Sequence, residues 1–269
     1  MRPLLYLPVA LLLLVALPVS LRAAPLLERA MDATLTLYTA DGRERFLGSA
    51  VLWEDGAIAV TNAHVVGRAD RVLIVARDGT RLEAEVIARD ETRDLALIRV
   101  NRALGPGLSP GAMPGIGDVV YAVGAPMGVP RSVTQGVISA EPRQREAHVP
   151  LRLLQHDAAV NPGSSGGPLV DAHGRLVGIN NRLEDGTGTY AGISYAISGA
   201  DLAVLVPALL AGDLAPMPKL GLTLRPVDPR IAAALGIPRD GVLVDAVEMG
   251  GAADRAGLRP GDILLVANG

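Results

Sequence analysis

The sequence predicts a mostly β protein whose strands form two small barrels, followed by a smaller unit. Hydrophobic residues make up 49% of the 269 residues and charged residues only 20%, so most of the chain can fold around a buried core. After residue 33, short apolar runs rich in β-branched residues alternate with Gly, Pro and Asp, which is typical of strands joined by turns. A Gly- and Pro-rich crossing from Gly105 to Gly117 divides these runs into two groups of six.

The predicted strands follow in chain order. The first group is Thr34–Thr39, Phe46–Leu52, Ala57–Thr61, Arg71–Ala76, Arg81–Ala88 and Leu95–Val100. The second group is Val119–Val123, Val133–Ser139, Leu151–Gln155, Leu169–Asp171, Leu176–Asn180 and Ile193–Ile197. Because each group is long enough to close on itself, we expect two barrels with a cleft between them.

A helix is predicted after the last of these strands, over Gly199–Leu210, with Ser198 as its N-cap and Pro207 as its weak point. Residues 212–218 read as a linker because they combine Gly, Pro and Asp. We therefore expect a main domain over residues 25–211 and a second unit over residues 219–269.

The N-terminus has the pattern of an export signal. Arg2 precedes an almost wholly apolar run from Leu4 to Leu21, and small residues follow at Ala23 and Ala24. Two outcomes are open: cleavage near Ala23 or Ala24, or retention of residues 1–24 as a membrane anchor, because the run is just long enough to span a bilayer. Either outcome places the rest of the chain outside the cytoplasm.

Composition excludes several classes of protein. The formal net charge of −3 argues against a basic face for nucleic acid. The chain has no cysteine, which excludes disulfides, thiolate zinc sites and a thiol nucleophile. Apart from His64, the histidines His148, His156 and His173 are scattered without metal-ligand spacing, and the Gly-rich stretches lack a P-loop lysine. We expect neither a metal nor a cofactor.

Three short strings carry candidate chemistry. Ser165 lies in the Gly-rich string 163–169, where small neighbours leave its hydroxyl accessible. A serine hydroxyl is a weak nucleophile unless a base takes its proton. His64, in the string 61–66, is the candidate base, and Asp94, in the string 93–97, is the candidate carboxylate that orients it. The chain order His, Asp, Ser is that of the chymotrypsin-type triad.

These strings make the chain resemble the HtrA/Deg family of exported trypsin-like serine proteases. The matching strings are Thr61–Val66, Asp94–Leu97, Val133–Ser139, Asp157–Leu169 and Gly192–Ile197. The resemblance implies a chymotrypsin-like double β-barrel and a serine endopeptidase of the periplasm or cell envelope. It also implies protein or peptide substrates, a role in protein quality control or stress response, and a homotrimer.

The resemblance also implies roles for the candidate residues. Ser165 attacks the scissile carbonyl, His64 removes and returns the proton, and Asp94 fixes the imidazole tautomer and stabilises the imidazolium. The backbone N–H groups of Gly163 and Ser165, helped by Ser164, form the oxyanion hole.

Substrate selection is predicted from the position six residues before Ser165. A trypsin-like enzyme that cleaves after Arg or Lys has an aspartate there, whereas this chain has Ala159. We therefore expect a preference for small or medium aliphatic P1 residues such as Val, Ala or Leu. We expect the substrate to add as a β-strand beside Ile193-Ser194-Tyr195.

The second unit resembles a PDZ domain. Leu220-Gly221-Leu222 looks like its peptide-binding loop and first strand, and the segment 251–264 looks like the part that packs under that strand. The string Ala267–Gly269 reads as a hairpin turn, and the family's next strand and groove helix are absent from the sequence, so we expect a partial α+β PDZ unit.

Two other functions stay open at this point. A non-catalytic binder or chaperone could keep the fold, but such a protein would not need all three catalytic strings. A membrane-anchored protease that regulates one partner would be favoured if residues 1–24 were retained.

Overall fold

The computed structural model describes residues 24–130, 132–144, 149, 151–181, 191–214, 220–236 and 241–266. The predicted export signal lies outside these residues except for Ala24. Most of the predicted linker, His148 and the predicted turn at 267–269 also lie outside them. In the described part of the chain, no helix is long and apolar enough to cross a membrane.

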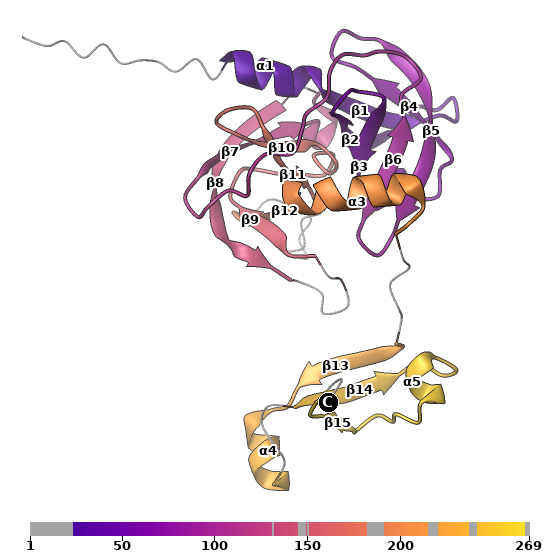
Figure 1. Cartoon of the computed structure of the whole chain (residues 1–269), viewed down its shortest axis with the longest axis vertical. Coiled ribbons are helices and arrows are strands. Elements are labelled where there is room, and N and C mark those ends of the chain that lie inside the picture. Colours follow the sequence, from indigo (N-terminus) through magenta and orange to yellow (C-terminus); the bar gives the residue numbers. More distant parts are fainter. Residues whose placement is uncertain are drawn as a thin grey trace, which may run out of the picture.

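The first barrel contains six antiparallel strands and closes in the order β1-β2-β3-β6-β5-β4 (Figure 1). Its strands are β1 Thr34–Thr39, β2 Phe46–Trp53, β3 Ile58–Thr61, β4 Arg71–Val75, β5 Arg81–Asp90 and β6 Leu95–Arg99. Each predicted strand of the first group is present, and the ends differ from the prediction by two residues at most.

The second barrel closes in the order β10-β11-β12-β9-β8-β7. Its strands are β7 Val119–Gly124, β8 Ser132–Arg143, β9 Leu153–His156, β10 Pro168–Asp171, β11 Leu176–Asn180 and β12 Ser194–Ser198. The predicted double barrel is confirmed. The largest difference is β8, which continues to Arg143 through two irregularities in its pairing with β9.

Helices lie at the edges of the barrels. They are α1 Ala24–Asp32, the single turn α2 Ala63–Val66 and α3 Gly199–Ala211, together with the short 3-10 helix η1 Pro126–Gly128. The helix α3 begins where the Ser198 hydroxyl accepts the Asp201 N–H at 3.0 Å, as the sequence predicts, and it continues through Pro207. Its residues contact β5 of the first barrel and β11 and β12 of the second, so α3 bridges the two barrels (Figure 1).

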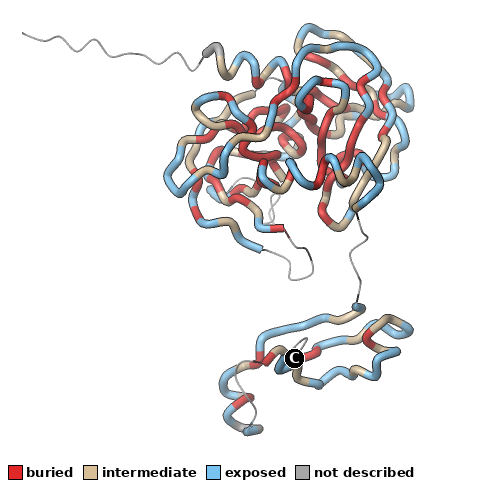
Figure 2. Tube along the Cα trace, viewed as in Figure 1, coloured by how far each residue is buried: buried red, intermediate tan, exposed pale blue. Residues whose placement is uncertain are grey.

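The core is continuous between the barrels. One buried apolar cluster includes Leu35, Leu52 and Leu97 of the first barrel together with Val170 and Ile179 of the second. A smaller cluster fills the second barrel alone. Figure 2 shows the buried segments concentrated within the two barrels. The boundary between the two barrels is called the seam. Because the core crosses this seam, burial of apolar surface holds the two barrels together.

The described part of the C-terminal unit is a three-stranded sheet in the order β13-β14-β15, with two short helices. The elements are β13 Leu222–Pro226, α4 Pro229–Leu235, β14 Val242–Val247, α5 Ala252–Arg255 and β15 Ile263–Leu264. Few of its apolar residues are buried, and Leu224, Leu265 and Val266 are more than 40% exposed.

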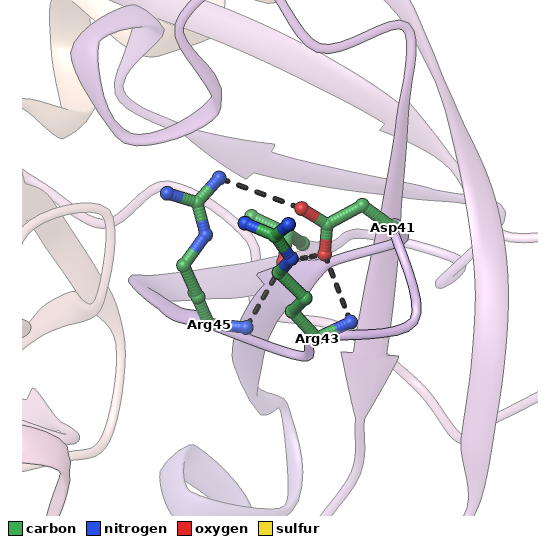
Figure 3. Close-up of polar contacts among 4 residues, drawn as sticks. Asp41, Arg43 and Arg45 are labelled. Carbon is green, nitrogen blue, oxygen red and sulfur yellow. Dashed lines mark hydrogen bonds and ion pairs between the residues drawn. The ribbon is translucent and has the colours of Figure 1, made fainter.

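The hairpin loop between β1 and β2 is ordered by polar contacts among exposed side chains (Figure 3). The Asp41 carboxylate accepts the Thr39 hydroxyl at 2.6 Å and the Arg43 N–H at 3.1 Å, and it lies 3.4 Å from the Arg45 guanidinium. The Arg45 N–H donates in turn to the Thr39 hydroxyl at 2.9 Å.

Candidate active site

His64 and Asp94 form a two-point contact in the first barrel. His64 lies on α2, directly after β3, and Asp94 lies in the loop between β5 and β6. The Nδ1 atom of His64 lies 2.7 Å from Asp94 Oδ2, and the His64 backbone N–H donates to Asp94 Oδ1 at 2.9 Å. With Nδ1 occupied by the carboxylate, Nε2 is the ring atom left to accept a proton. The side chains are 28% and 24% exposed, so the pair lies at the surface of the seam.

The backbone of Asp94 has an unusual conformation. Its φ is +53°, in the left-handed region that costs a non-glycine residue about 1 kcal/mol. Three contacts hold it there: the two from His64, and a hydrogen bond at 3.1 Å from the Asn62 side-chain amide to the Asp94 carbonyl. Aspartate tolerates this region better than most residues. The strained backbone therefore aims the carboxylate at His64.

The loop before Ser165 contains a tight turn over residues 161–164. The Ser164 N–H donates to the Asn161 carbonyl at 2.9 Å, Pro162 takes the second position, and Gly163 takes the third with φ +102°. This is the signature of a type II turn, which requires a positive φ at its third residue. A Cβ on Gly163 would also collide with the Ala125 carbonyl and the Phe46 ring, so glycine is required here.

This turn corrects one expectation. Ser164 was expected to help to bind an oxyanion, but its N–H is already used to close the turn. Within the described residues, by contrast, the N–H groups of Gly163 and Ser165 are paired with no protein acceptor. Each of these two N–H groups is free to donate to a further acceptor.

The segment after β7 fixes the direction of the Gly163 N–H. The Met127 N–H donates to the Pro162 carbonyl at 2.7 Å. In a trans peptide the carbonyl and the next N–H point in opposite directions. The Gly163 N–H therefore points away from Met127. Met127 itself has φ +54°, a second strained non-glycine backbone at the site.

Ser165 lies close to the segment that carries His64. A Cβ on Gly48, in β2, would lie 3.0 Å from the Val65 side chain and 3.3 Å from the Ser165 carbonyl oxygen. The Ser49 N–H donates to that same carbonyl at 3.0 Å. The side chain of the residue after His64 and the Ser165 backbone thus both lie next to Gly48. The Ser165 backbone and the segment that carries the His64–Asp94 pair therefore both lie against β2.

The predicted pocket residues lie together on the second barrel. Ala159 is partly buried, and its carbonyl accepts the Thr134 hydroxyl at 2.7 Å. The Ser194 hydroxyl is fully buried and donates to the Ala158 carbonyl at 3.1 Å, which places β12 beside the segment that precedes the turn. Ile193 is 49% exposed.

The predicted strand addition beside Ile193-Ser194-Tyr195 stays a prediction. Ser194 and Tyr195 pair with β9 on one side, and on the other side the Tyr195 carbonyl accepts the Asn181 N–H at 2.8 Å. The pairing of β12 with β11 covers residues 196–198 and ends before these three residues.

In the C-terminal unit, the structure brings the predicted segments together. The Leu220 carbonyl accepts the Ala253 N–H and the Gly221 carbonyl accepts the Glu248 N–H, both at 2.8 Å. Gly221 has φ +71°, and Leu222 begins β13.

Two residues of this site were not found by sequence reasoning. Ser49 is a fully buried serine in the middle of β2, where a buried strand normally carries apolar side chains, and this was the only signal for it. Met127 had no signal, because its role comes from its backbone. Within the described residues, no three His, Asp or Glu side chains cluster in a way that could hold a metal ion.

Comparison with known proteins gives a consistent result. Residues 48–179 match the model of the trypsin-like peptidase domain. The chain is 38% identical over 230 residues to the "probable periplasmic serine endoprotease DegP-like" of Halomonas elongata, an alignment that covers 84% of this chain and 48% of that protein. The protein of the same name from Chlamydia trachomatis is 34% identical over 231 residues, with 84% and 46% covered. The chain therefore spans about half the length of the curated relatives it matches.

One solved structure is matched over a larger share of its own length than the curated relatives are. The HtrA-type protease AlgW, solved with a tripeptide, superposes with a TM-score of 0.74 at 36% identity, and the match covers 90% of this chain and 81% of that one. The residues matched by the peptidase-domain model lie within the two barrels, which extend from Thr34 to Ser198. The chain belongs to the HtrA family of trypsin-like serine proteases.

Proposed function

We propose that the chain cleaves unfolded or exposed segments of periplasmic proteins through an acyl-enzyme formed on Ser165. His64 takes the proton of the Ser165 hydroxyl and returns it to the leaving amine, while Asp94 holds the imidazole in the required tautomer. The observation that carries the proposal is the 2.7 Å contact between His64 Nδ1 and Asp94 Oδ2, which leaves Nε2 for the nucleophile. The DegP-like relatives, named as periplasmic serine endoproteases, support the periplasmic location, and cleavage of unfolded segments would serve protein quality control.

Two free N–H donors can stabilise the negative charge that develops on the substrate oxygen in the transition state. When the hydroxyl adds to the carbonyl, the oxygen becomes an oxyanion, and the N–H groups of Gly163 and Ser165 are placed to bind it. Loss of one such donor typically costs on the order of 10²–10³ in kcat. The type II turn supports this role, because it leaves the Gly163 N–H unpaired within the described residues.

The pocket chemistry supports an aliphatic P1 residue. Ala159 supplies no negative charge, and the buried hydroxyl of Ser194 is occupied by the Ala158 carbonyl. A P1 arginine or lysine would therefore find no ionic partner among these residues, whereas Val, Ala or Leu needs none.

The test uses the purified chain, its Ser165→Ala variant and casein as an unfolded substrate, with mass spectrometry of the cut sites. We expect cleavage after aliphatic residues, lost in Ser165→Ala and kept in Ser139→Ala, a matched variant at an exposed serine of β8. Equal cleavage by Ser165→Ala would refute the nucleophile. Cleavage confined to Arg and Lys would refute the pocket.

A further inference from the structure

Ser49 connects the first barrel to the turn that carries the oxyanion donors. It lies in β2, and its side chain is fully buried. Its hydroxyl donates to the Gly163 carbonyl at 2.8 Å and accepts the Ala125 N–H at 3.0 Å. Its backbone N–H donates to the Ser165 carbonyl at 3.0 Å, and its carbonyl accepts the Thr61 hydroxyl at 2.7 Å. One residue thus makes four hydrogen bonds at the seam.

The chemistry of the partners fixes the direction of both hydroxyl bonds. A carbonyl can only accept and an amide N–H can only donate, so the single hydrogen of Ser49 goes to Gly163, and its oxygen receives the hydrogen of Ala125. The site is fully buried, so water cannot easily replace this hydroxyl. Its loss would leave two buried backbone groups unpaired.

These contacts hold the two peptide groups that flank the Gly163 Cα, one of which contains the Gly163 N–H. The Gly163 carbonyl is held by Ser49, and the Pro162 carbonyl is held by the Met127 N–H at 2.7 Å. Ala125 lies two residues before Met127 on the same segment, so the Ser49 hydroxyl also anchors the segment that holds Pro162. Ser49 therefore acts on the direction of the Gly163 N–H in two ways: through the Gly163 carbonyl, and through the Ala125 N–H of the segment that holds Pro162.

The Thr61 contact relates this turn to the catalytic base. Thr61 is three residues before His64, and its hydroxyl donates to the Ser49 carbonyl. The chain of contacts from Thr61 through Ser49 to Gly163 thus fixes the turn relative to the segment that carries His64.

We propose that Ser49 is a positioning residue for catalysis, whose hydroxyl fixes the oxyanion turn by joining the Gly163 carbonyl to the Ala125 N–H. The proposal rests on the function proposed above, in which Gly163 and Ser165 stabilise the oxyanion. It requires that loss of the hydroxyl weaken binding of the transition state more than binding of the substrate.

The experiment compares the full chain with its Ser49→Ala variant on a fluorogenic peptide with an aliphatic P1 residue. We expect kcat to fall about 10- to 100-fold with KM changed less than about threefold, because both donors remain but are less well placed. The inhibition constant of a peptidyl trifluoromethyl ketone, which forms a tetrahedral oxyanion adduct with the serine, should rise by the same factor as kcat/KM falls. Affinity for the uncleaved peptide, measured on a Ser165→Ala background, should stay within about twofold.

Two further variants separate positioning from general damage. Ser198→Ala removes another fully buried serine hydroxyl, one that bonds Asp201 at the start of α3, away from the turn. It should lower the thermal midpoint comparably and leave kcat unchanged. Ser49→Cys keeps a weak donor of similar size, and we expect a loss of kcat smaller than that of Ser49→Ala. It serves in place of Ser49→Ala if that variant does not fold.

The outcomes distinguish the two proposals. If Ser165→Ala remains active, the proposed function is wrong. If Ser165→Ala is inactive but the Ser49 variants keep the kcat and ketone affinity of Ser198→Ala, only the role of Ser49 is wrong. Equal losses of ketone and uncleaved-peptide affinity in the Ser49 variants would also overturn it, because they would indicate a change in substrate binding.

Discussion

Two hydrogen-bond networks, one in the loop before β2 and one centred on Ser49 within β2, differ in burial. The hairpin network joins Thr39, at the end of β1, to Asp41, Arg43 and Arg45 in the loop, where all four side chains contact solvent (Figure 3). The seam network joins Ser49, Thr61, Ala125, Gly163 and Ser165, and the Ser49 and Thr61 side chains are fully buried. Both networks include a hydroxyl that donates to one group and accepts an N–H.

Burial decides what each network can do. In the hairpin, water can replace any partner, so a broken bond costs little. At the seam, a broken bond leaves a buried donor or acceptor without a partner. We infer that the hairpin network orders a loop, whereas the seam network fixes the geometry of the site.

The largest expected effect compares one glycine from each region. Gly166→Ala and Gly42→Ala both place a Cβ at positive φ, +81° and +73°. The Cβ on Gly166 would collide with the Ser49 carbonyl and the Thr61 hydroxyl, whereas nothing lies within 4 Å of the Cβ on Gly42. We expect Gly166→Ala to cost more than about 3 kcal/mol and most of the activity, and Gly42→Ala about 1 kcal/mol with activity kept. Urea unfolding and peptide hydrolysis measure both, and equal costs would refute the comparison.

The same difference explains how much the sequence could predict. The strands were found because each is a short apolar run bounded by turn residues, a signal that is local. The candidate triad was found because its strings stand in a known chain order. The contact between His64 and Asp94 and the packing of Gly48 against Val65 and Ser165 depend on distant segments, and only the structure reports them.

The sequence did not reveal the role of Ser49, for a physical reason. Three of its four hydrogen-bond partners, Ala125, Gly163 and Ser165, lie 76 to 116 residues away along the chain. Local patterns predict elements, whereas contacts between elements decide the site.

A smaller effect is expected from a buried group in the second barrel. His156, on β9, is fully buried, and both ring nitrogens lack a hydrogen-bond partner among the described residues. Burial lowers its pKa from 6.5 to about 4, although the charge of Asp157 acts in the opposite direction. The unfolded chain therefore binds the proton first as the pH falls, so stability is lost between about pH 6.5 and 4, by about 3 kcal/mol in total.

His156→Leu tests this prediction, because it removes the titrating ring and keeps an apolar side chain. We expect the variant to lack this part of the pH dependence and to exceed the natural chain in stability near pH 5. Urea unfolding of both proteins at several values between pH 7.5 and 4 measures the difference. Parallel stability curves would show that the imidazole does not stay neutral in the folded state.

The smallest effect is expected in the hairpin. The hydrogen bond from the Thr39 hydroxyl lowers the pKa of the Asp41 carboxyl below its ordinary value, and the contacts with Arg43 and Arg45 act in the same direction. This contribution is present at neutral pH and is lost only in acid, as the carboxylate takes up a proton. Because the group is exposed, we expect Asp41→Ala to lower the thermal midpoint by no more than about 3 °C and to leave kcat unchanged. A loss of kcat as large as that of Ser49→Ala would mean that the hairpin network also fixes the site, and that burial does not separate the two networks.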